Sequence, residues 1–398
     1  MKKRRLTLVI ASTIALAACS DGRVSPLAAD VRPAENLSPK AASYMSNYVA
    51  VGTSVSMGWA DDGVVGSSQR NSWPLKLAEQ VGVAFTVPAI AEPGCPPPLA
   101  PPLISFRRTD GTSAGPSTVC APNEPGVTLP THNLAVEGAT TAEALNATPA
   151  TAQPGKGPVT SRVLPPGMTQ MTAMHSLNPT FVSVEFGGNE ILPAQVGLLY
   201  PGVTFTPLSV FTANYSQIID NVQATGAKAV LTTLRLDLRN FPTIRTGPEV
   251  ASQRSAFAAY NVTVNADCNA SPNFIFVRGK VLTAIITGIT RAGFGLGPYD
   301  LSCADIAGTA DYVLTPTDIS SLNTLAAQMS DAVESEAAEN GYATFSLGVL
   351  YDRSKEDVPF DLSFYLTSDT PYGPFISLDG VHPTAKGQTI LARAARQA

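Results

Sequence analysis

Short apolar runs alternate with amphipathic segments along this 398-residue chain, and this alternation constrains the fold more than any other feature of the sequence. Five runs have the length of buried strands, and they cover residues 47–52, 133–138, 181–188, 227–234 and 342–350. Four segments have helical periodicity, and they cover residues 72–82, 208–226, 318–341 and 384–397. Strands that alternate with helices favour a parallel sheet covered on both faces. The sequence therefore predicts a three-layer α/β/α sandwich around a five-stranded parallel sheet.

Two long stretches interrupt the alternation. Residues 90–130 are rich in Pro and Gly, and residues 240–317 have weaker periodicity. Long loops in a compact domain are usually functional. We therefore expect two insertions beside the carboxyl ends of the strands, the second forming a partial lid over the sheet edge.

The N-terminus resembles the signal of a bacterial lipoprotein. A basic start precedes a short apolar core, which is typical of a secretory signal and not of a membrane-spanning helix. The sequence Leu-Ala-Ala-Cys then resembles the lipobox, in which the peptide is cut before a cysteine that carries lipid. We interpret residues 1–18 as the signal peptide, Cys19 as the lipidated residue, 19–45 as a flexible tether and 46–398 as the folded domain.

The residue after the lipobox cysteine predicts the membrane. Ser20 follows Cys19, whereas Asp in this position often signals retention in the inner membrane of enteric bacteria. Acyl chains contribute about 0.8 kcal/mol per buried methylene, so a multiply acylated cysteine would anchor the protein firmly. We therefore expect the protein in the cell envelope, anchored in the outer membrane with its domain on the periplasmic or surface side.

The remaining cysteines favour two disulfides. Cys95, Cys120, Cys268 and Cys303 are an even number in a chain expected to reach an oxidising compartment. Sequence order favours the pairs Cys95–Cys120 and Cys268–Cys303, although four cysteines allow three connectivities.

Charge and motif content argue against several classes of partner. The chain has 26 basic and 31 acidic residues, and no basic stripe that would follow a nucleic-acid backbone. No cluster of His, Cys and Asp has the spacing of a zinc site, and no glycine-rich loop has the spacing of a phosphate-binding motif. We therefore expect no nucleic acid, metal or cofactor.

The first apolar run ends in Gly-Thr-Ser, with the serine at position 54. A serine hydroxyl becomes a nucleophile when a histidine takes its proton and a carboxylate orients that histidine. His382 has a suitable carboxylate in its own loop, because Asp379 precedes it by three residues. Ser54, His382 and Asp379 are therefore the candidate nucleophile, base and orienting acid.

Glycines and an asparagine after two other runs could stabilise an oxyanion. Gly138 ends the second run, Gly187 and Gly188 end the third, and Asn189 follows directly. In a flavodoxin-like sheet of strand order 2-1-3-4-5, ligands bind where the first and third strands end. Ser54 and Asn189 would meet there.

Four blocks in this order resemble the GDSL or SGNH hydrolases. They read VAVGTSVSMG, NLAVEGAT, VEFGGNE and DGVHPTAKGQ, and the resemblance spans about residues 46–398 without the two insertions. It implies a flavodoxin-like fold and an esterase or lipase that cleaves carboxylic esters, whether lipid, acetylated sugar or small aryl esters. It also implies that Ser54 is the nucleophile, His382 the base and Asp379 its orienting acid, with Gly138, Asn189 and the Ser54 amide donating to the oxyanion.

Two positions depart from the family pattern. Thr53 and Glu190 stand where the family usually has Asp, and neither position is expected to perform the chemistry. These departures bear on the local turn geometry and on substrate preference.

Alternative interpretations exist for several residues. The segment GTSAG matches the Gly-x-Ser-x-Gly elbow and would make Ser113 the nucleophile, but it lacks the strand and helix that this motif needs. His132 and His175 are interpreted as structural residues. A second hypothesis is an inactive surface lipoprotein that binds glycan or protein through its disulfide-stapled insertions.

Overall fold

The computed structural model describes residues 43–355 and 358–398. The predicted signal peptide, Cys19 and most of the predicted tether therefore lie outside the described residues. All described residues belong to a single unit.

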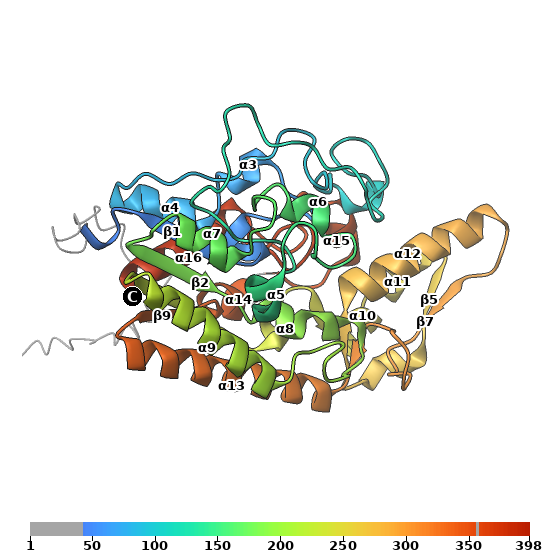
Figure 1. Cartoon of the computed structure of the whole chain (residues 1–398). Helices are drawn as coiled ribbons and strands as arrows, with labels where there is room; N and C mark the ends of the chain where they lie inside the picture. The colour runs from blue at the N-terminus through green and yellow to red at the C-terminus, as the bar shows by residue number, and fades with distance from the viewer. Residues whose placement is uncertain (1–42, 356–357) are drawn as a thin grey trace, which may run out of the picture. The chain divides into compact units, whose positions relative to one another are not determined.

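A parallel sheet lies at the centre of this unit (Figure 1). In their order of pairing, its strands are β1 (Tyr48–Gly52), β2 (Phe181–Glu185), β3 (Lys228–Thr233) and β9 (Ala343–Ser346). Nearly all residues of the first three strands are buried, as expected for strands covered on both faces. Parallel pairing brings the carboxyl ends of the four strands to one edge of the sheet.

The second predicted strand, residues 133–138, runs beside β1 without forming a regular strand. Ala50 donates to the His132 carbonyl and accepts from the Leu134 amide, both at 2.8 Å, which gives a parallel bridge. The side chain of Asn133 accepts a hydrogen bond from the Ala135 amide, and such local bonds compete with a ladder. In the described residues the five predicted runs thus give a four-stranded sheet with this segment alongside.

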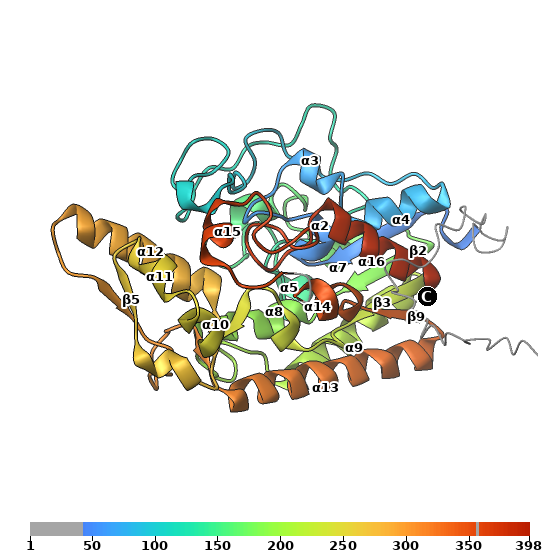
Figure 2. The same cartoon turned by 180° about the vertical axis from the view of Figure 1, so that it is seen from behind.

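Helices cover both faces of the sheet (Figures 1 and 2). Helices α4 (Trp73–Val81) and α16 (Ala385–Gln397) pack together on one face, and α9 (Leu208–Ala224) and α13 (Pro316–Asn340) on the other. All four predicted helices are therefore confirmed. The shorter helices are α2 (Ser54–Met57), α3 (Gly66–Gln69), α5 (Thr141–Asn146), α6 (Gly157–Thr160), α7 (Gln170–Ser176), α8 (Gly188–Ile191), α10 (Gly247–Ala251), α11 (Arg254–Ala258), α14 (Gly348–Ser354) and α15 (Leu362–Thr367).

Local signals fix the ends of the longest helix. The hydroxyl of Thr315 accepts from the Asp318 amide, and the Asp318 carboxylate accepts from the Thr315 amide, which is a capping box. Gly341, with a φ of 64°, ends α13 in the left-handed conformation that glycine adopts without strain.

The first insertion, residues 90–130, has little regular structure. It contains one 3-10 turn, Leu103–Ser105, and a few isolated bridges. The disulfide Cys95–Cys120 joins its two ends, as predicted.

The second insertion, residues 240–317, is more ordered than predicted. An antiparallel sheet is formed by β4 (Ile244–Thr246), β6 (Phe274–Phe276) and β8 (Val313–Leu314), and β5 (Val262–Val264) pairs with β7 (Tyr299–Leu301). Helix α12 (Val277–Gly293) extends with β5 and β7 away from the central sheet (Figure 1). These strands have only two or three residues, which is too short for a periodic pattern to show in the sequence. The disulfide Cys268–Cys303 is present, as predicted.

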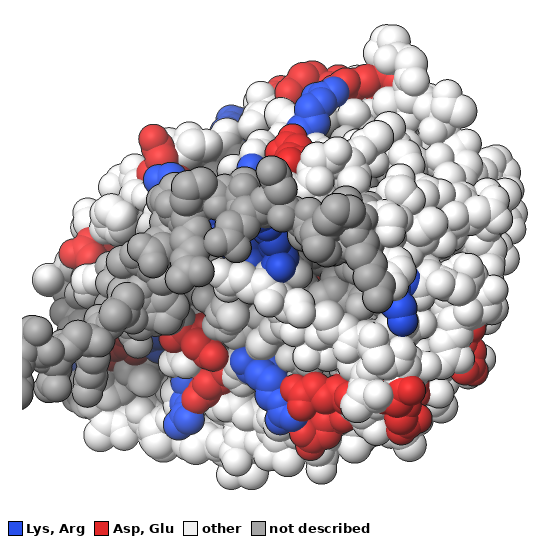
Figure 3. All heavy atoms as spheres, turned by 90° about the vertical axis from the view of Figure 1, so that its left-hand side faces the viewer, with Lys and Arg blue, Asp and Glu red and all other residues white. Residues whose placement is uncertain are grey.

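The surface has no dominant charge on the face drawn in Figure 3, where acidic and basic side chains lie next to one another in small groups. Across residues 43–355 and 358–398, no helix combines the length and the apolar character needed to cross a bilayer.

Candidate active site

Ser54 lies at the carboxyl edge of the sheet, where β1 ends and α2 begins. Thr53 is the N-cap of this four-residue helix, and Gly58 ends it with a φ of 86°. A Cβ atom on Gly58 would lie 2.8 Å from the backbone of residues 68 and 69, so only glycine fits this turn. Ser54 is 4% exposed, and the turn directs it to the cavity described below.

The structure brings Ser54, His382 and Asp379 together. Nε2 of His382 lies 2.8 Å from Oγ of Ser54, and Nδ1 lies 3.0 Å from Oδ2 of Asp379. Oδ1 of Asp379 accepts from the backbone amides of Val381 and His382 at 2.9 and 2.8 Å. These are hydrogen-bonding distances, so the carboxylate fixes the ring while the ring faces the serine.

Electrostatics favour proton transfer to His382. Burial opposes charge on Asp379, but His382, Arg278 and the His382 amide outweigh it and hold the pKa of Asp379 below its ordinary value. Burial also favours a neutral His382, yet the Asp379 carboxylate outweighs burial and raises the pKa of His382 above 6.5. The imidazolium that forms when His382 accepts a proton is therefore stabilised in place.

Asn189 is well placed to stabilise an oxyanion. It lies in α8, directly after β2, and lines the same cavity as Ser54 and Gly188. One hydrogen of its side-chain amide goes to the Ala139 carbonyl at 2.8 Å, and the second remains for a ligand. The Ser54 amide begins α2 and has no carbonyl partner within the helix.

Gly138, the other predicted oxyanion donor, belongs to the loop that holds the Asn189 side chain. It has a φ of 75° and is not among the residues that line the cavity with Ser54. Its neighbour Ala139 holds the Asn189 side chain through its carbonyl. The structure thus connects Gly138 to the candidate oxyanion site through the loop it belongs to.

Glu190 ties this glycine loop to the asparagine loop. Its Oε1 accepts from the Thr141 amide at 2.7 Å, and its Oε2 accepts from the Gly187 amide at 3.0 Å. Burial raises the pKa of Glu190 above its ordinary value. Glu190, which replaces the usual Asp of the family, therefore holds the two loops beside Ser54 together.

Sequence reasoning missed Glu185, which contacts the turn of residues 52–56 that carries Ser54, called the nucleophile turn below. Parallel pairing sets it opposite Gly52. Its Oε2 accepts from the amides of Thr53 and Ser56 at 3.0 and 3.2 Å, and the hydroxyls of Thr53 and Ser56 also bond to it. Thr53, the other departure from the family pattern, therefore anchors the turn to β2. A carboxylate at the last position of an apolar strand was the available signal.

Ser54 and His382 line a largely apolar cavity. Its empty space, including the open mouth, is about 830 Å³. The second insertion supplies part of the wall through Phe241, Ile244 and Phe276. The other large apolar side chains of the lining are Ile191, Leu192, Leu234, Leu236, Leu238, Leu314, Leu322, Leu347 and Tyr351. The indole of Trp59 lies 6.3 Å from the His382 ring, centroid to centroid.

The alternative candidates lie apart from this cavity. Ser113 is exposed, and its hydroxyl accepts from the Gly115 amide. His132 bonds to Thr86 through Nδ1, and Nε2 of His175 lies 3.0 Å from the side-chain oxygen of Asn221. These contacts suit structural roles for both histidines.

Comparisons with known proteins place this site in a family. The model of the GDSL-like lipase/acylhydrolase family matches residues 48–395. Two solved structures from Streptomyces are similar over 88% of this chain and 99% of their own. The extracellular lipase of Streptomyces rimosus is 15% identical with a TM-score of 0.38, and the phospholipase A1 of Streptomyces albidoflavus is 12% identical with a TM-score of 0.35. No curated protein matches the chain. Because the family match runs from β1 to α16 and includes Ser54, Asn189 and the Asp379–His382 loop, this chain belongs to the GDSL-like lipase/acylhydrolase family and is an ester hydrolase.

Proposed function

We propose that the chain hydrolyses carboxylic esters with an apolar acyl group through an acyl-serine intermediate on Ser54. One observation carries this proposal: the Ser54 hydroxyl is hydrogen-bonded to His382 at 2.8 Å on the wall of an apolar cavity.

The reaction follows from the geometry of the site. The Ser54 Oγ attacks the ester carbonyl carbon while Nε2 of His382 takes the hydroxyl proton, and the carbonyl electrons move to the oxygen. The Ser54 amide and the free hydrogen of the Asn189 side chain stabilise that oxyanion. Its collapse breaks the bond to the alcohol, which leaves with the proton from His382. Water, deprotonated by His382, then attacks the acyl-serine, and collapse releases the acid and restores Ser54.

The lining of the cavity supports an apolar acyl chain as the group it binds. Burial of each methylene contributes about 0.8 kcal/mol, so a longer acyl chain gains binding free energy as long as the cavity accommodates it. An acetylated sugar would leave most of this apolar surface unoccupied. We therefore infer that kcat/KM rises with acyl length across a series of p-nitrophenyl esters from acetate to laurate. A kcat/KM highest for acetate would contradict the apolar-acyl part of the proposal and leave ester hydrolysis intact.

Three variants test the chemistry. Ser54→Ala is expected to lower kcat by a factor of about 10⁴ or more and to abolish labelling by a fluorophosphonate probe. Asn189→Ala keeps the nucleophile and base, so a loss of about 10²–10³ in kcat is expected. Ser113→Ala is the control and should match the wild type. Full activity of a folded Ser54→Ala variant, checked by circular dichroism, would exclude the mechanism.

For the location of the protein, the proposal rests on the sequence alone. The lipobox and Ser20 support export, lipidation of Cys19 and attachment to the outer membrane. Cys19→Ser is expected to move the protein from the membrane fraction to the soluble fraction, with ester turnover unchanged. A variant that stays wholly in the membrane fraction would refute lipid anchoring.

A further inference from the structure

We propose that Asp62 is a positioning residue for the proposed Ser54 reaction: its backbone amide holds the Asp379 carboxylate, and two arginines, one from each insertion, hold Asp62. This inference rests on the proposed function, since it assigns Asp379 to the reaction. It also gives the two insertions a shared task that the cavity lining alone does not explain.

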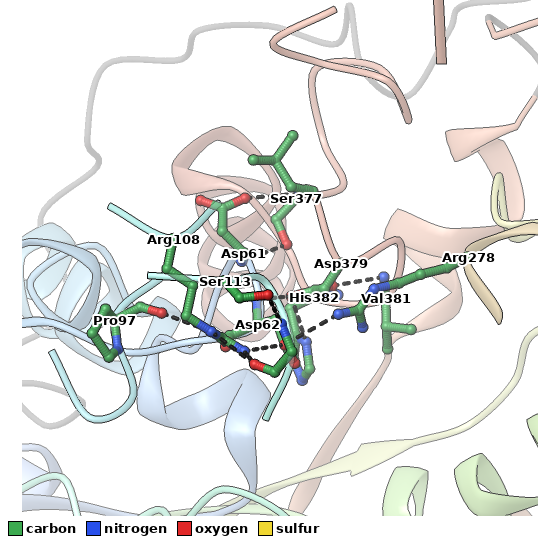
Figure 4. A network of polar contacts seen from close by, with 12 residues as sticks. Asp61, Asp62, Pro97, Arg108, Ser113, Arg278, Ser377, Asp379, Val381 and His382 are labelled. Carbon is green, nitrogen blue, oxygen red and sulfur yellow. Dashed lines mark hydrogen bonds and ion pairs between the residues drawn. The ribbon is translucent and has the colours of Figure 1, made fainter. Parts of the chain in front are cut away.

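The residues around Asp62 form a tight turn that docks on the Asp379 loop (Figure 4). Ala60 and Gly63 bond to each other through both backbone pairs, and Asp61 and Asp62 each have a φ of 56°. Positive φ at both central positions is the pattern of a type I′ turn, which Asp tolerates better than most residues. The Asp61 amide donates to the Ser377 hydroxyl at 3.0 Å, which fixes the turn against the loop.

The amide of Asp62 donates to Oδ2 of Asp379 at 2.9 Å. The same oxygen accepts from Nδ1 of His382 at 3.0 Å. The direction of the carboxylate, and with it the orientation of the imidazole, therefore depends on where the turn places this amide. Tilting the turn would change the geometry between His382 and Ser54.

The first insertion holds Asp62 through Arg108. This guanidinium, only 3% exposed, donates to Oδ2 of Asp62 at 2.9 Å and to the Asp62 carbonyl at 2.9 Å. It also donates to the carbonyls of Pro97 and Gly115, at 2.7 Å and at 3.1–3.2 Å. Because these carbonyls belong to residues 90–130, Arg108 joins the body of the insertion to the turn.

The second insertion holds the same carboxylate oxygen. Arg278, the second residue of α12, lies 3.1 Å from Oδ2 of Asp62. Burial opposes its charge, but Asp62 and Asp379 outweigh burial and raise the pKa of Arg278. Two guanidiniums therefore share one carboxylate, which is the arrangement expected where a single acidic group must be held from two sides.

We call the contacts of Asp62 with Asp379, Arg108 and Arg278 the clamp. Because the clamp places charges around His382, changes in it should alter the pH dependence of kcat/KM. Four carboxylates interact electrostatically with His382: Asp379 in its own loop, Asp61 and Asp62 in the turn, and Glu137, which pairs with Lys156. Arg278 of α12 interacts with Asp62 and Asp379. Glu185 and Tyr351 lie across the cavity with Ser54. Asp62 favours the charged imidazole. Arg278 pairs with Asp62 and lowers the pKa of Asp379, so its positive charge should oppose a charged imidazole beside these carboxylates. Removing either charge should therefore move the pKa of His382, in opposite directions.

The test compares Asp62→Asn with Arg278→Met. Asp62→Asn is expected to move the acid limb of kcat/KM to lower pH, and Arg278→Met to higher pH, each by roughly one pH unit. Both variants should lower kcat by about tenfold with KM within twofold, because a displaced base affects the chemical step. Arg278→Lys keeps the charge and should recover the wild-type acid limb. Arg291→Met removes a half-buried arginine from the far end of the same helix, where it donates to the Gly297 carbonyl, and is the matched control.

A second readout does not depend on turnover. The chain has three histidines, so the His382 imidazole can be assigned by NMR from the signal lost in His382→Ala. Its titration should follow the same opposite shifts. Lower melting temperatures with an unchanged His382 titration in both variants would overturn the proposal and leave a merely structural clamp. If instead Ser54→Ala is as active as the wild type, the proposed function itself has failed.

Discussion

At the scale of single residues, the carboxylate of Glu185 determines how the nucleophile turn is held. Burial raises its pKa to about 7, although four hydrogen-bond donors from Thr53 and Ser56 favour the charged form. Only the Thr53 hydroxyl contacts Oε1, and a hydroxyl can also accept. Protonated Glu185, or a glutamine in its place, can therefore donate to Thr53 while Oε2 keeps its bonds to the two amides.

Glu185→Gln should remove a pH-dependent contribution to stability. A pKa raised in the folded state favours folding below the unfolded value of 4.5, and this contribution is lost as the pH rises through about 7. The difference corresponds to about 3 kcal/mol. The free energy of unfolding of Glu185→Gln, relative to the wild type, should therefore increase from pH 4.5 to pH 8 in urea titrations. Glu79→Gln, on the exposed side of α4, is the control, and an equal offset at both pH values would contradict the assignment.

The role of a residue could be predicted from the sequence where the residue that it contacts is close in the chain. Asp379 and His382 are three residues apart in one turn, so their contact follows from local geometry. Glu185 and Arg278 could not be recognised, because their partners Thr53 and Asp62 belong to distant segments. In the sequence they resemble an ordinary strand end and an ordinary surface arginine.

At the scale of elements, the antiparallel sheet of the second insertion forms one wall of the cavity. Strands β4 and β6 contribute Ile244 and Phe276, and Leu314 comes from β8. A partial lid over the sheet edge was predicted, but the short strands that build this wall were not visible in the sequence. These three side chains are buried in the same apolar core as the central sheet.

Ile244→Phe should shorten the acyl chain that the cavity accepts. Ile244 is 6% exposed and faces the cavity from β4, so a larger side chain there occupies space that an acyl chain would use. Losing room for two methylenes would lower kcat/KM for the laurate ester by roughly tenfold relative to the butyrate ester. Ile286→Phe, on the exposed side of α12, is the matched control. Equal losses for both esters would mean that the substitution perturbs the site as a whole.

The parallel central sheet could be predicted from the alternation of strands and helices. The placement of Ser54 and Asn189 at one edge could also be predicted, because both residues follow parallel strands. The irregular course of residues 133–138 could not, because it depends on the Asn133 side chain, which bonds to the Ala135 amide and to the Ser56 carbonyl.

At the scale of the whole molecule, each insertion is closed by one disulfide. The bonds join residues 25 and 35 positions apart, and crosslinks of this span restrict the unfolded chain. Removing either pair by Cys→Ala substitution should lower the free energy of unfolding by about 3–4 kcal/mol. Loss of either disulfide should also reduce kcat, because the Cys95–Cys120 loop contains Arg108 and the Cys268–Cys303 loop contains Arg278. An unchanged kcat in both double variants, measured well below the melting temperature, would argue against this link.

Ser54 and His382 are 328 positions apart, and His382 enters with the last loop before the final helix. The proposed nucleophile, the asparagine and every strand of the central sheet therefore precede the proposed base in the chain. A folding intermediate in which the sheet has formed but the Asp379–His382 loop has not packed would hold Ser54 without its base. On the proposed mechanism, ester hydrolysis therefore starts only when this late segment packs against the rest of the domain.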